Sequence, residues 1–323
     1  MSGSKRIAWD GISFLIPDNW ELAIYKYLRR GVTHLEIEDE FSARIEMEWI
    51  RPKKKTQMNH VLARYEKKTK RLTSSAHHRK PIKNLPEGWA ATHYTFAETV
   101  VRRGKRTGLQ VVKHGLVTAF FLSPDSKLFC FLTFHFLPED KERPADITRL
   151  VASEFRHHFD EALVPWELFD IAFEVPQGFH LEKTLIAIGS KLMIFRWKQR
   201  RFFLWHLSCA NIFLKEDTNV EEWLAAHMND SRAALGGIFY VDDKRQIQWR
   251  RRRRHFIAHR ETLARWCLRY RIAWHLDTEK NQLIAWAFNY RKAQDLEAIP
   301  ESLQFDPHLP PPSEPAPESR PQS

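Results

Sequence analysis

A short phrase that occurs twice constrains the fold of this chain more than any other feature. Residues 14–22 (FLIPDNWEL) return as residues 173–181 (FEVPQGFHL), and every position is displaced by 159 residues. Proline cannot donate a hydrogen bond to a sheet ladder, so each phrase predicts a strand that ends at its proline. The polar residues that follow favour a tight turn, and the aromatic residue then starts the next strand. The repeat therefore predicts architecture rather than a reaction.

A second correspondence supports a duplication of the whole unit. Residues 118–136 match residues 272–290 without a gap, at a displacement of 154 residues. Only five residues of net deletion separate the two correspondences. We interpret the chain as a tandem duplication with a first domain at residues 1–162, a second at 163–305 and a disordered, Pro-rich tail at 306–323.

Hydrophobic periodicity predicts the same order of elements in both halves: strand, proline turn, strand, two strands, helix, three strands, helix. In residues 43–50, apolar and charged side chains alternate, as in a strand with one buried face. Met58, Val61, Leu62 and Tyr65 form one stripe of a helix. The fold class that follows is α+β, with two antiparallel sheets flanked by helices.

Several local expectations accompany this order. Residues 7–16 lead into the first phrase as a strand, and Trp20, Leu22 and Ile24 alternate along the next one. Residues 74–83, with the pair His77-His78, are expected to form a loop. The pair His157-His158 is expected near the end of a helix, and residues 293–299 are expected to form a further helix.

The two proline turns also carry a resemblance. Residues 16–20 (IPDNW) and 175–179 (VPQGF), each opening a sheet of antiparallel strands with flanking helices, resemble the Mog/PsbP-like fold. Members of that fold include a nuclear-import factor that binds the Ran GTPase, a photosystem subunit and bacterial chaperones of secreted effectors. The resemblance implies two tandem binding domains rather than a catalytic activity. No functional residue is carried over from it.

Composition indicates a globular protein with a real core. The chain has 323 residues, 43% of them hydrophobic, and a formal charge of +11. Three separated cysteines, Cys130, Cys209 and Cys267, give no metal knuckle or disulfide framework. No secretory signal is expected, and no apolar run is long enough to span a bilayer. We therefore expect a bacterial cytoplasmic protein without membrane insertion.

The positive charge is concentrated in one segment of the second copy. Residues 244–271 contain eleven basic residues and a single acid, Glu261. Five adjacent guanidinium groups cannot be buried unpaired, so residues 250–254 should form an exposed strand end or hairpin tip. Beyond them, Trp266, Leu268, Tyr270, Ile272 and Trp274 predict one apolar strand face. The predicted partner-binding basic face comprises Arg250, Arg251, Arg252, Arg253, Arg254, Arg265, Arg269 and Arg271.

Three interpretations of this basic face compete. The arginines could pair internally with carboxylates such as Glu46 and Glu48. They could instead bind an acidic protein partner. Alternatively, segment 244–271 could bind nucleic acid through phosphate contacts and stacking on Trp249 and Phe256. The identity of the partner and the oligomeric state are not specified by the sequence.

No motif of an enzyme occurs in the chain. Phosphate loops, dinucleotide fingerprints and metalloprotease signatures are absent, and the sixteen histidines show no ligand spacing. We expect no catalytic residue, no cofactor and no metal site. The leading hypothesis is a non-enzymatic protein-binding adaptor or chaperone-like module, and the alternative is a nucleic-acid-binding protein.

Overall fold

The computed structural model describes most of the chain in ten segments. These are residues 3–28, 32–52, 55–102, 108–168, 171–187, 189–198, 200–215, 218–230, 237–251 and 269–299. The predicted disordered tail at 306–323 lies outside them. In the described part, no helix is both long and apolar enough to cross a membrane.

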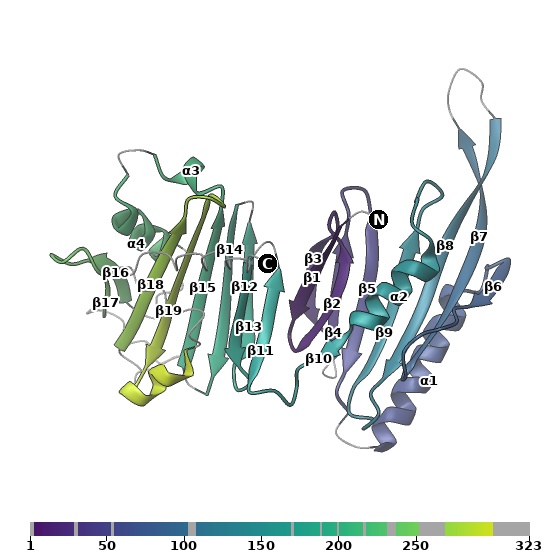
Figure 1. The fold of residues 1–323 in the computed structure, drawn as a ribbon, viewed down its shortest axis with the longest axis horizontal. Helices are drawn as coiled ribbons and strands as arrows, with labels where there is room; N and C mark the ends of the chain where they lie inside the picture. The colour runs from purple at the N-terminus through teal and green to yellow at the C-terminus, as the bar shows by residue number, and fades with distance from the viewer. Residues whose placement is uncertain are drawn as a thin grey trace, which may run out of the picture. The chain divides into compact units, whose positions relative to one another are not determined.

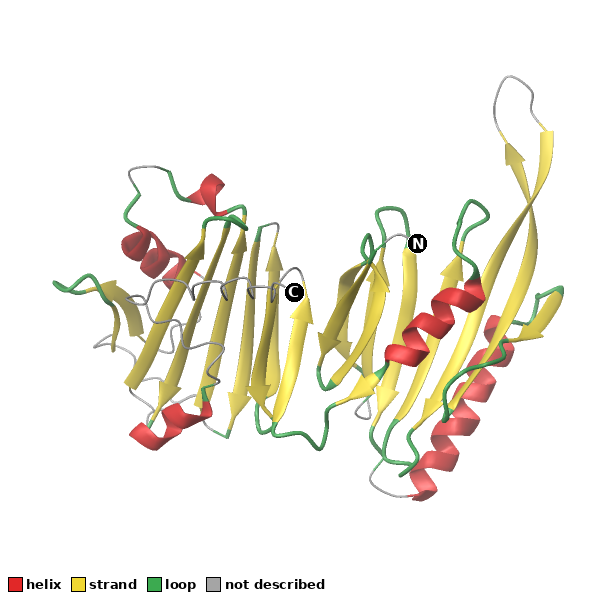
Figure 2. Ribbon diagram, viewed as in Figure 1, coloured by secondary structure: helices red, strands yellow, loops and turns green. Residues whose placement is uncertain are grey.

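Antiparallel sheet dominates the structure, and helices are few (Figures 1 and 2). The chain divides into two compact units. The first unit comprises Met1–His158 and Pro165–Ala172, and the second comprises Phe159–Val164 and Phe173–Ser323. The predicted sheet-rich character is thus confirmed. The domain boundaries at 162 and 305 and the Mog/PsbP-like assignment remain predictions.

The first unit contains a small and a large antiparallel sheet. Its elements are β1 (Ser4–Trp9), β2 (Ile12–Pro17), β3 (Glu21–Tyr27), β4 (Thr33–Glu38), β5 (Ala43–Ile50), α1 (Lys55–Leu72), β6 (His78–Pro81), β7 (Trp89–Arg102), β8 (Gly108–Leu122), β9 (Phe129–Phe136), α2 (Pro144–Glu154) and β10 (Arg156–His157). The small sheet includes, in this order, strands β10, β2, β1 and β11 (Leu163–Leu168). The large sheet has the order β3-β4-β5-β9-β8-β7-β6.

Helices α1 and α2 cover opposite faces of the large sheet. Tyr65 of α1 packs on Phe131, whose ring also contacts Phe120 of β8. Phe155, directly after α2, packs on the neighbouring Phe121. Adjacent residues of a strand point to opposite faces, so α1 and α2 lie on different sides of the sheet. Phe155 also contacts Phe14 of the small sheet, which closes the core on that side.

The second unit contains a five-stranded sheet and a separate hairpin. Its elements are β12 (Ile171–Pro176), which begins in the first unit, β13 (His180–Ala187), β14 (Ser190–Trp197), β15 (Arg200–Ser208), α3 (Ala210–Phe213), α4 (Val220–Asp230), β16 (Gly237–Val241), β17 (Ile247–Arg251), β18 (Arg269–Asp277), β19 (Gln282–Tyr290) and the 3₁₀ helix η3 (Ala293–Ala298). The sheet order is β13-β14-β15-β19-β18. Strand β17 also contacts β18. If the order is continued through β17 and β16, it becomes β13-β14-β15-β19-β18-β17-β16. This order matches β3-β4-β5-β9-β8-β7-β6 of the first unit strand by strand.

The repeated phrase adopts the same local geometry in both copies. The amide of Trp20 donates to the carbonyl of Pro17 at 3.0 Å, and the amide of Phe179 donates to Pro176 at 2.8 Å. One β-bulge follows each turn, after Leu22 in β3 and after Leu181 in β13. A bulge inserts one extra residue and redirects the side chains beyond it. This explains why Ile24, predicted to share the buried face of Leu22, is 38% exposed.

A tight turn corrects the prediction for residues 7–16. They form a hairpin rather than one strand, because Asp10 and Gly11 both have positive φ angles, 48° and 85°. Two successive residues with positive φ, most often Asn-Gly or Asp-Gly, form the turn that matches the twist of a hairpin. The Asp-Gly pair was the sequence signal for this turn.

Two further local predictions were wrong. Residues 78–81, predicted as loop, form the edge strand β6 by pairing with β7. His157 belongs to β10 rather than to a helix end, and the next residue, His158, has its Nε2 2.8 Å from the hydroxyl of Ser13. Both strands are short and depend on a distant partner strand, so periodicity could not reveal them. The helix predicted at 293–299 is confirmed as the 3₁₀ helix η3.

Candidate functional site

The predicted basic face is only partly within the described structure. Arg250 lies on β17, and Arg269 and Arg271 lie on β18; all three side chains are exposed. Arg251 ends β17, and nothing of its side chain is described. The remaining predicted members lie outside the described residues: Arg252, Arg253, Arg254 and Arg265. We use the name basic edge for Arg250, Arg269 and Arg271.

The basic edge follows from strand alternation. On β18 the side chains of Tyr270, Ile272 and Trp274 are partly buried against the core of the second unit. Arg269 and Arg271 alternate with them and point to the other face, opposite Tyr290 and Phe288 of β19. On β17, the guanidinium of Arg250 lies 4.9 Å from the ring centroid of Tyr240. Such a cation–π contact orients the side chain without neutralising its charge.

The carboxylates proposed as internal partners of the arginines are already engaged. Glu46 Oε1 lies 3.0 Å from Nε2 of His135. Glu48 accepts hydrogen bonds from Tyr65 at 2.6 Å and from Lys68 at 2.7 Å. Across the described segments, no carboxylate forms an ion pair with any of the three arginines of the basic edge. Among the described residues, internal pairing with a carboxylate therefore accounts for none of these three charges.

One aromatic residue proposed for base stacking, Trp249, is partly buried against the core. Trp249 packs on Tyr270 with ring centroids 4.7 Å apart, and it lies against the core of the second unit. Its indole Nε1 is buried. Stacking on a nucleobase requires an accessible ring face. Trp249 is only partly exposed and already packs on the ring of Tyr270. Phe256, the other proposed stacking residue, lies outside the described residues.

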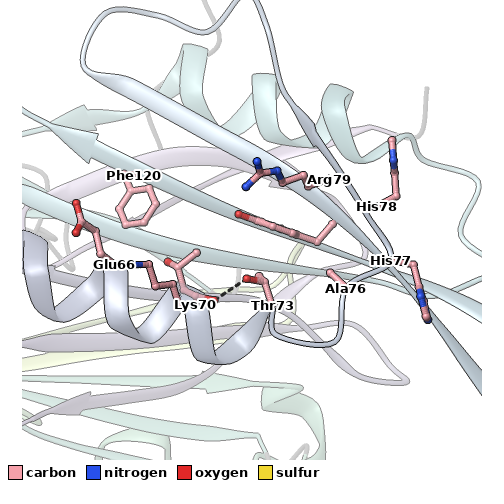
Figure 3. Close-up of a pocket in the computed structure, with 10 residues that line it drawn as sticks. Glu66, Lys70, Thr73, Ala76, His77, His78, Arg79 and Phe120 are labelled. Carbon is pink, nitrogen blue, oxygen red and sulfur yellow. Dashed lines mark hydrogen bonds between the residues drawn. The ribbon is translucent and has the colours of Figure 1, made fainter.

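A cavity that the sequence did not suggest lies in the first unit, between α1 and β6. It has a volume of about 560 Å³ and is open to solvent. Its walls come from the last turns of α1, the connection to β6, and strands β7 and β8 (Figure 3). Phe120 and Tyr94 supply aromatic surface, while Lys70 and Arg79 supply positive charge. We call it the α1–β6 cavity.

Sequence patterns could not have identified this cavity. Its residues run from Glu66 to Phe120 and come from four elements, so only pairing of β6, β7 and β8 brings them together. The sequence predicted a loop for His77 and His78, whereas His78 begins β6. These two side chains and that of Lys70 are exposed, and the cavity that they share is a tertiary feature.

Next to the cavity, a buried polar network fixes α1 to the sheet. Glu48 is the centre of this network, with Tyr65 and Lys68 from α1 as hydrogen-bond donors. His34 of β4, opposite Glu48 in the register, lies 3.9 Å from it. Burial raises the pKa of Glu48, but the hydrogen bonds from Lys68 and Tyr65 outweigh it and hold the pKa below its ordinary value. Burial and the bond to Glu48 raise the pKa of Tyr65.

This network predicts acid-sensitive stability of the first unit. A carboxyl group with a lowered pKa stabilises the fold above its unfolded pKa, here 4.5, and the contribution disappears as pH falls through the folded pKa. We expect Glu48→Gln to lower stability by about 1–3 kcal/mol at neutral pH and to flatten its loss below about pH 4.5. Chemical unfolding across this pH range measures both effects. Glu87→Gln, at an exposed position, is the control. If the free energy of unfolding depended on pH with the same slope in both variants, the prediction would be contradicted.

Metal chemistry finds no support in the described residues. Within those segments, no group of three or more His, Cys, Asp or Glu side chains is arranged to hold a metal ion. The thiol of Cys130 is buried, and burial raises its pKa, which disfavours the reactive thiolate.

The chain was also compared with known proteins: no family model matches it, and no match was found among curated proteins.

Proposed function

We propose that this protein is a non-enzymatic adaptor or chaperone-like module that binds an acidic protein segment along the basic edge of its second unit. One observation carries the proposal. Arg250, Arg269 and Arg271 are exposed, and they lack carboxylate partners in the described structure, while the carboxylates suggested for them are engaged elsewhere. Maintaining unpaired arginines side by side costs repulsion, which an acidic ligand relieves.

We further propose that the chain is a tandem pair of Mog/PsbP-like domains. The two units share the same turn, the same position of the bulge after it and corresponding strand orders, and these features support a duplication. The fold suggests binding rather than catalysis by analogy alone. A cytoplasmic location and the boundaries 1–162 and 163–305 belong to the same proposal.

An acidic protein fits the basic edge better than nucleic acid does. Arginine pairs with carboxylates through its planar fork and needs no neighbouring aromatic platform. Recognition of single-stranded nucleic acid combines positive charge with accessible aromatic rings. Trp249 is packed against Tyr270, and the ring of Tyr240 already has Arg250 beside it. The described surface thus offers charge without stacking.

Binding of a fluorescein-labelled oligoglutamate peptide tests this function. We expect the double variant Arg269→Glu/Arg271→Glu to bind the peptide at least about tenfold more weakly than wild type, because two attractions become repulsions. The matched control is Lys183→Glu/Arg196→Glu, which makes the same charge change at exposed positions of β13 and β14. Fluorescence anisotropy at fixed ionic strength gives the affinities. Equal weakening in both variants would show a net-charge effect and refute the basic edge.

The same experiment also tests whether the protein binds nucleic acid instead of an acidic peptide. Single-stranded and duplex DNA probes are titrated alongside the peptide at several salt concentrations. Weak binding of both probes by wild type supports the acidic protein partner. Tighter binding of DNA than of oligoglutamate, with a steep salt dependence that Arg250→Gln reduces, would favour the alternative function.

A further inference from the structure

The α1–β6 cavity has the features of a ligand site rather than of a packing defect. Its volume of about 560 Å³ lies within the usual range for small-molecule pockets, about 300–1,000 Å³. Its floor includes the ring of Phe120, which is anchored beneath by Phe129 and Phe131. A ring held in this way offers a rigid apolar surface at little entropic cost.

The cationic groups of the cavity converge from two different elements. Lys70 comes from the last turns of α1, whereas Arg79 comes from β6. Arg79 lies opposite Tyr94 in the β6–β7 register, so the two side chains share the face that borders the cavity. Neither Lys70 nor Arg79 forms an ion pair with any carboxylate in the segments that the structure describes. No carboxylate of the described segments therefore competes with a ligand for these two charges.

The acidic side chain of the cavity lies at one end. Among the described lining residues, Glu66 is the only acidic one, and it lies with Phe120 at that end. His77 and His78 lie at the other end (Figure 3). Glu66 stands one helical turn before Lys70, yet no ion pair joins them in the described structure. A ligand with an apolar group near Phe120 and a negative group towards Lys70 and Arg79 complements this arrangement.

The neighbouring edge strand does not favour recognition by strand addition. β6 has only four residues, His78–Pro81, all exposed, and it is the terminal strand of its sheet. Its brevity, its charged residues and Pro81 are the features that protect an edge from pairing with another chain. A ligand here would be recognised by side chains of the cavity rather than by backbone pairing.

We propose that the α1–β6 cavity binds a carboxylate attached to an aromatic ring, with the ring on Phe120 and the carboxylate between Lys70 and Arg79. Charge-assisted bonds from Lys and Arg to a carboxylate are the strong class of hydrogen bond, and the arginine fork fits that group. Such a ligand exists as a free aromatic acid and as the C-terminal aromatic residue of a peptide. The inference concerns the first unit alone and does not depend on the basic edge.

The test uses the full chain and a peptide of Gly-Ser repeats that ends in phenylalanine, labelled with fluorescein at its N-terminus. Unlabelled competitors are the same peptide as free acid, the same peptide as C-terminal amide, and 3-phenylpropanoate. We expect the free acid to compete at least about tenfold better than the amide. If 3-phenylpropanoate competes as well as the peptide acid, the cavity is a site for small aromatic acids. If 3-phenylpropanoate does not compete, the cavity recognises the C-terminal residue of a peptide. Either outcome supports the proposal.

Variants assign the binding to the cavity. Lys70→Gln/Arg79→Gln is expected to weaken binding of the labelled peptide by about tenfold or more. The matched control, Lys67→Gln/Arg71→Gln, removes two exposed charges of the same helix that do not line the cavity, and it should change binding less than about twofold. Amide hydrogen exchange of α1 verifies folding of each variant. No binding by wild type, equal competition by amide and acid, or equal weakening in the two variants would each overturn the proposal.

Discussion

Replacing Arg44 with methionine is expected to destabilise the first unit by about 3–5 kcal/mol. Arg44 is 6% exposed and holds two carboxylates. Its Nε lies 2.6 Å from Asp39, in the turn between β4 and β5, and its Nη1 lies 2.6 Å from Asp140, in the loop after β9. Removing the guanidinium would leave both carboxylates buried without their cation, and this penalty is the physical reason for the large effect.

Hydrogen exchange read by mass spectrometry measures this loss separately for each unit. Exchange of the most protected amides in β4, β5 and β9 should accelerate by at least about a hundredfold, while protection in the second unit is unchanged. Arg71→Met, on the exposed face of α1, is the control and should shift stability by less than about 0.5 kcal/mol.

A compensating variant distinguishes two causes of such a loss of stability: carboxylates left buried without a cation, and lost packing of the Arg44 side chain. Adding Asp39→Asn and Asp140→Asn to Arg44→Met should restore part of the stability, because neutral amides cost less to bury than unpaired carboxylates. No restoration would show that Arg44 acts through packing. A destabilisation below about 1 kcal/mol would contradict the buried ion-pair argument altogether.

Trp205→Ala is expected to cost the second unit about 3–5 kcal/mol. Trp205 is fully buried, in a core cluster built from β15, α4, the β16–β17 hairpin and β19. Its ring lies 5.8 Å from that of Phe203 and 6.3 Å from that of Phe239. Truncation removes apolar contacts and leaves a void that these rings cannot fill, and the cost grows with the residual cavity.

Two further variants calibrate that result. Trp205→Phe should cost much less, because it keeps a ring and removes an indole Nε1 that is buried without a hydrogen-bond partner. Ile212→Ala changes a side chain that is 71% exposed and should have an effect below about 0.5 kcal/mol. Urea unfolding and exchange of β15 and β19 amides give the values. Similar costs for Trp205→Ala and Ile212→Ala would contradict the assignment of Trp205 to the core.

Long, strongly patterned elements were predictable because their signal is local. Residues 43–50 alternate, and Ile45, Met47 and Trp49 are buried in β5 as the alternation requires. Met58 and Tyr65 were predicted to lie on one stripe of a helix, and both are buried on α1. In both cases, residues within one or two turns or strand steps determine the outcome.

Short elements and irregularities were not predictable from pattern. β6 and β10 contain four and two residues, too few for a periodic signal, and each exists only because a distant strand supplies its hydrogen bonds. Bulges shift the register by one residue and reverse the expected face, as at Ile24. The Asp10-Gly11 turn is the exception, since its dipeptide specifies a hairpin locally.

By itself, the sequence determined the repeat, most strands, the main helices and the alternation that leaves Arg269 and Arg271 exposed on β18. These features depend on residue type and spacing within a few positions. Only the tertiary structure decided that Glu46 and Glu48 are engaged, that Trp249 is packed away, and that Lys70, Arg79 and Phe120 border one cavity. The reason is physical: burial and the pairing of charges depend on contacts between strands and helices far apart in the chain, which no local pattern encodes.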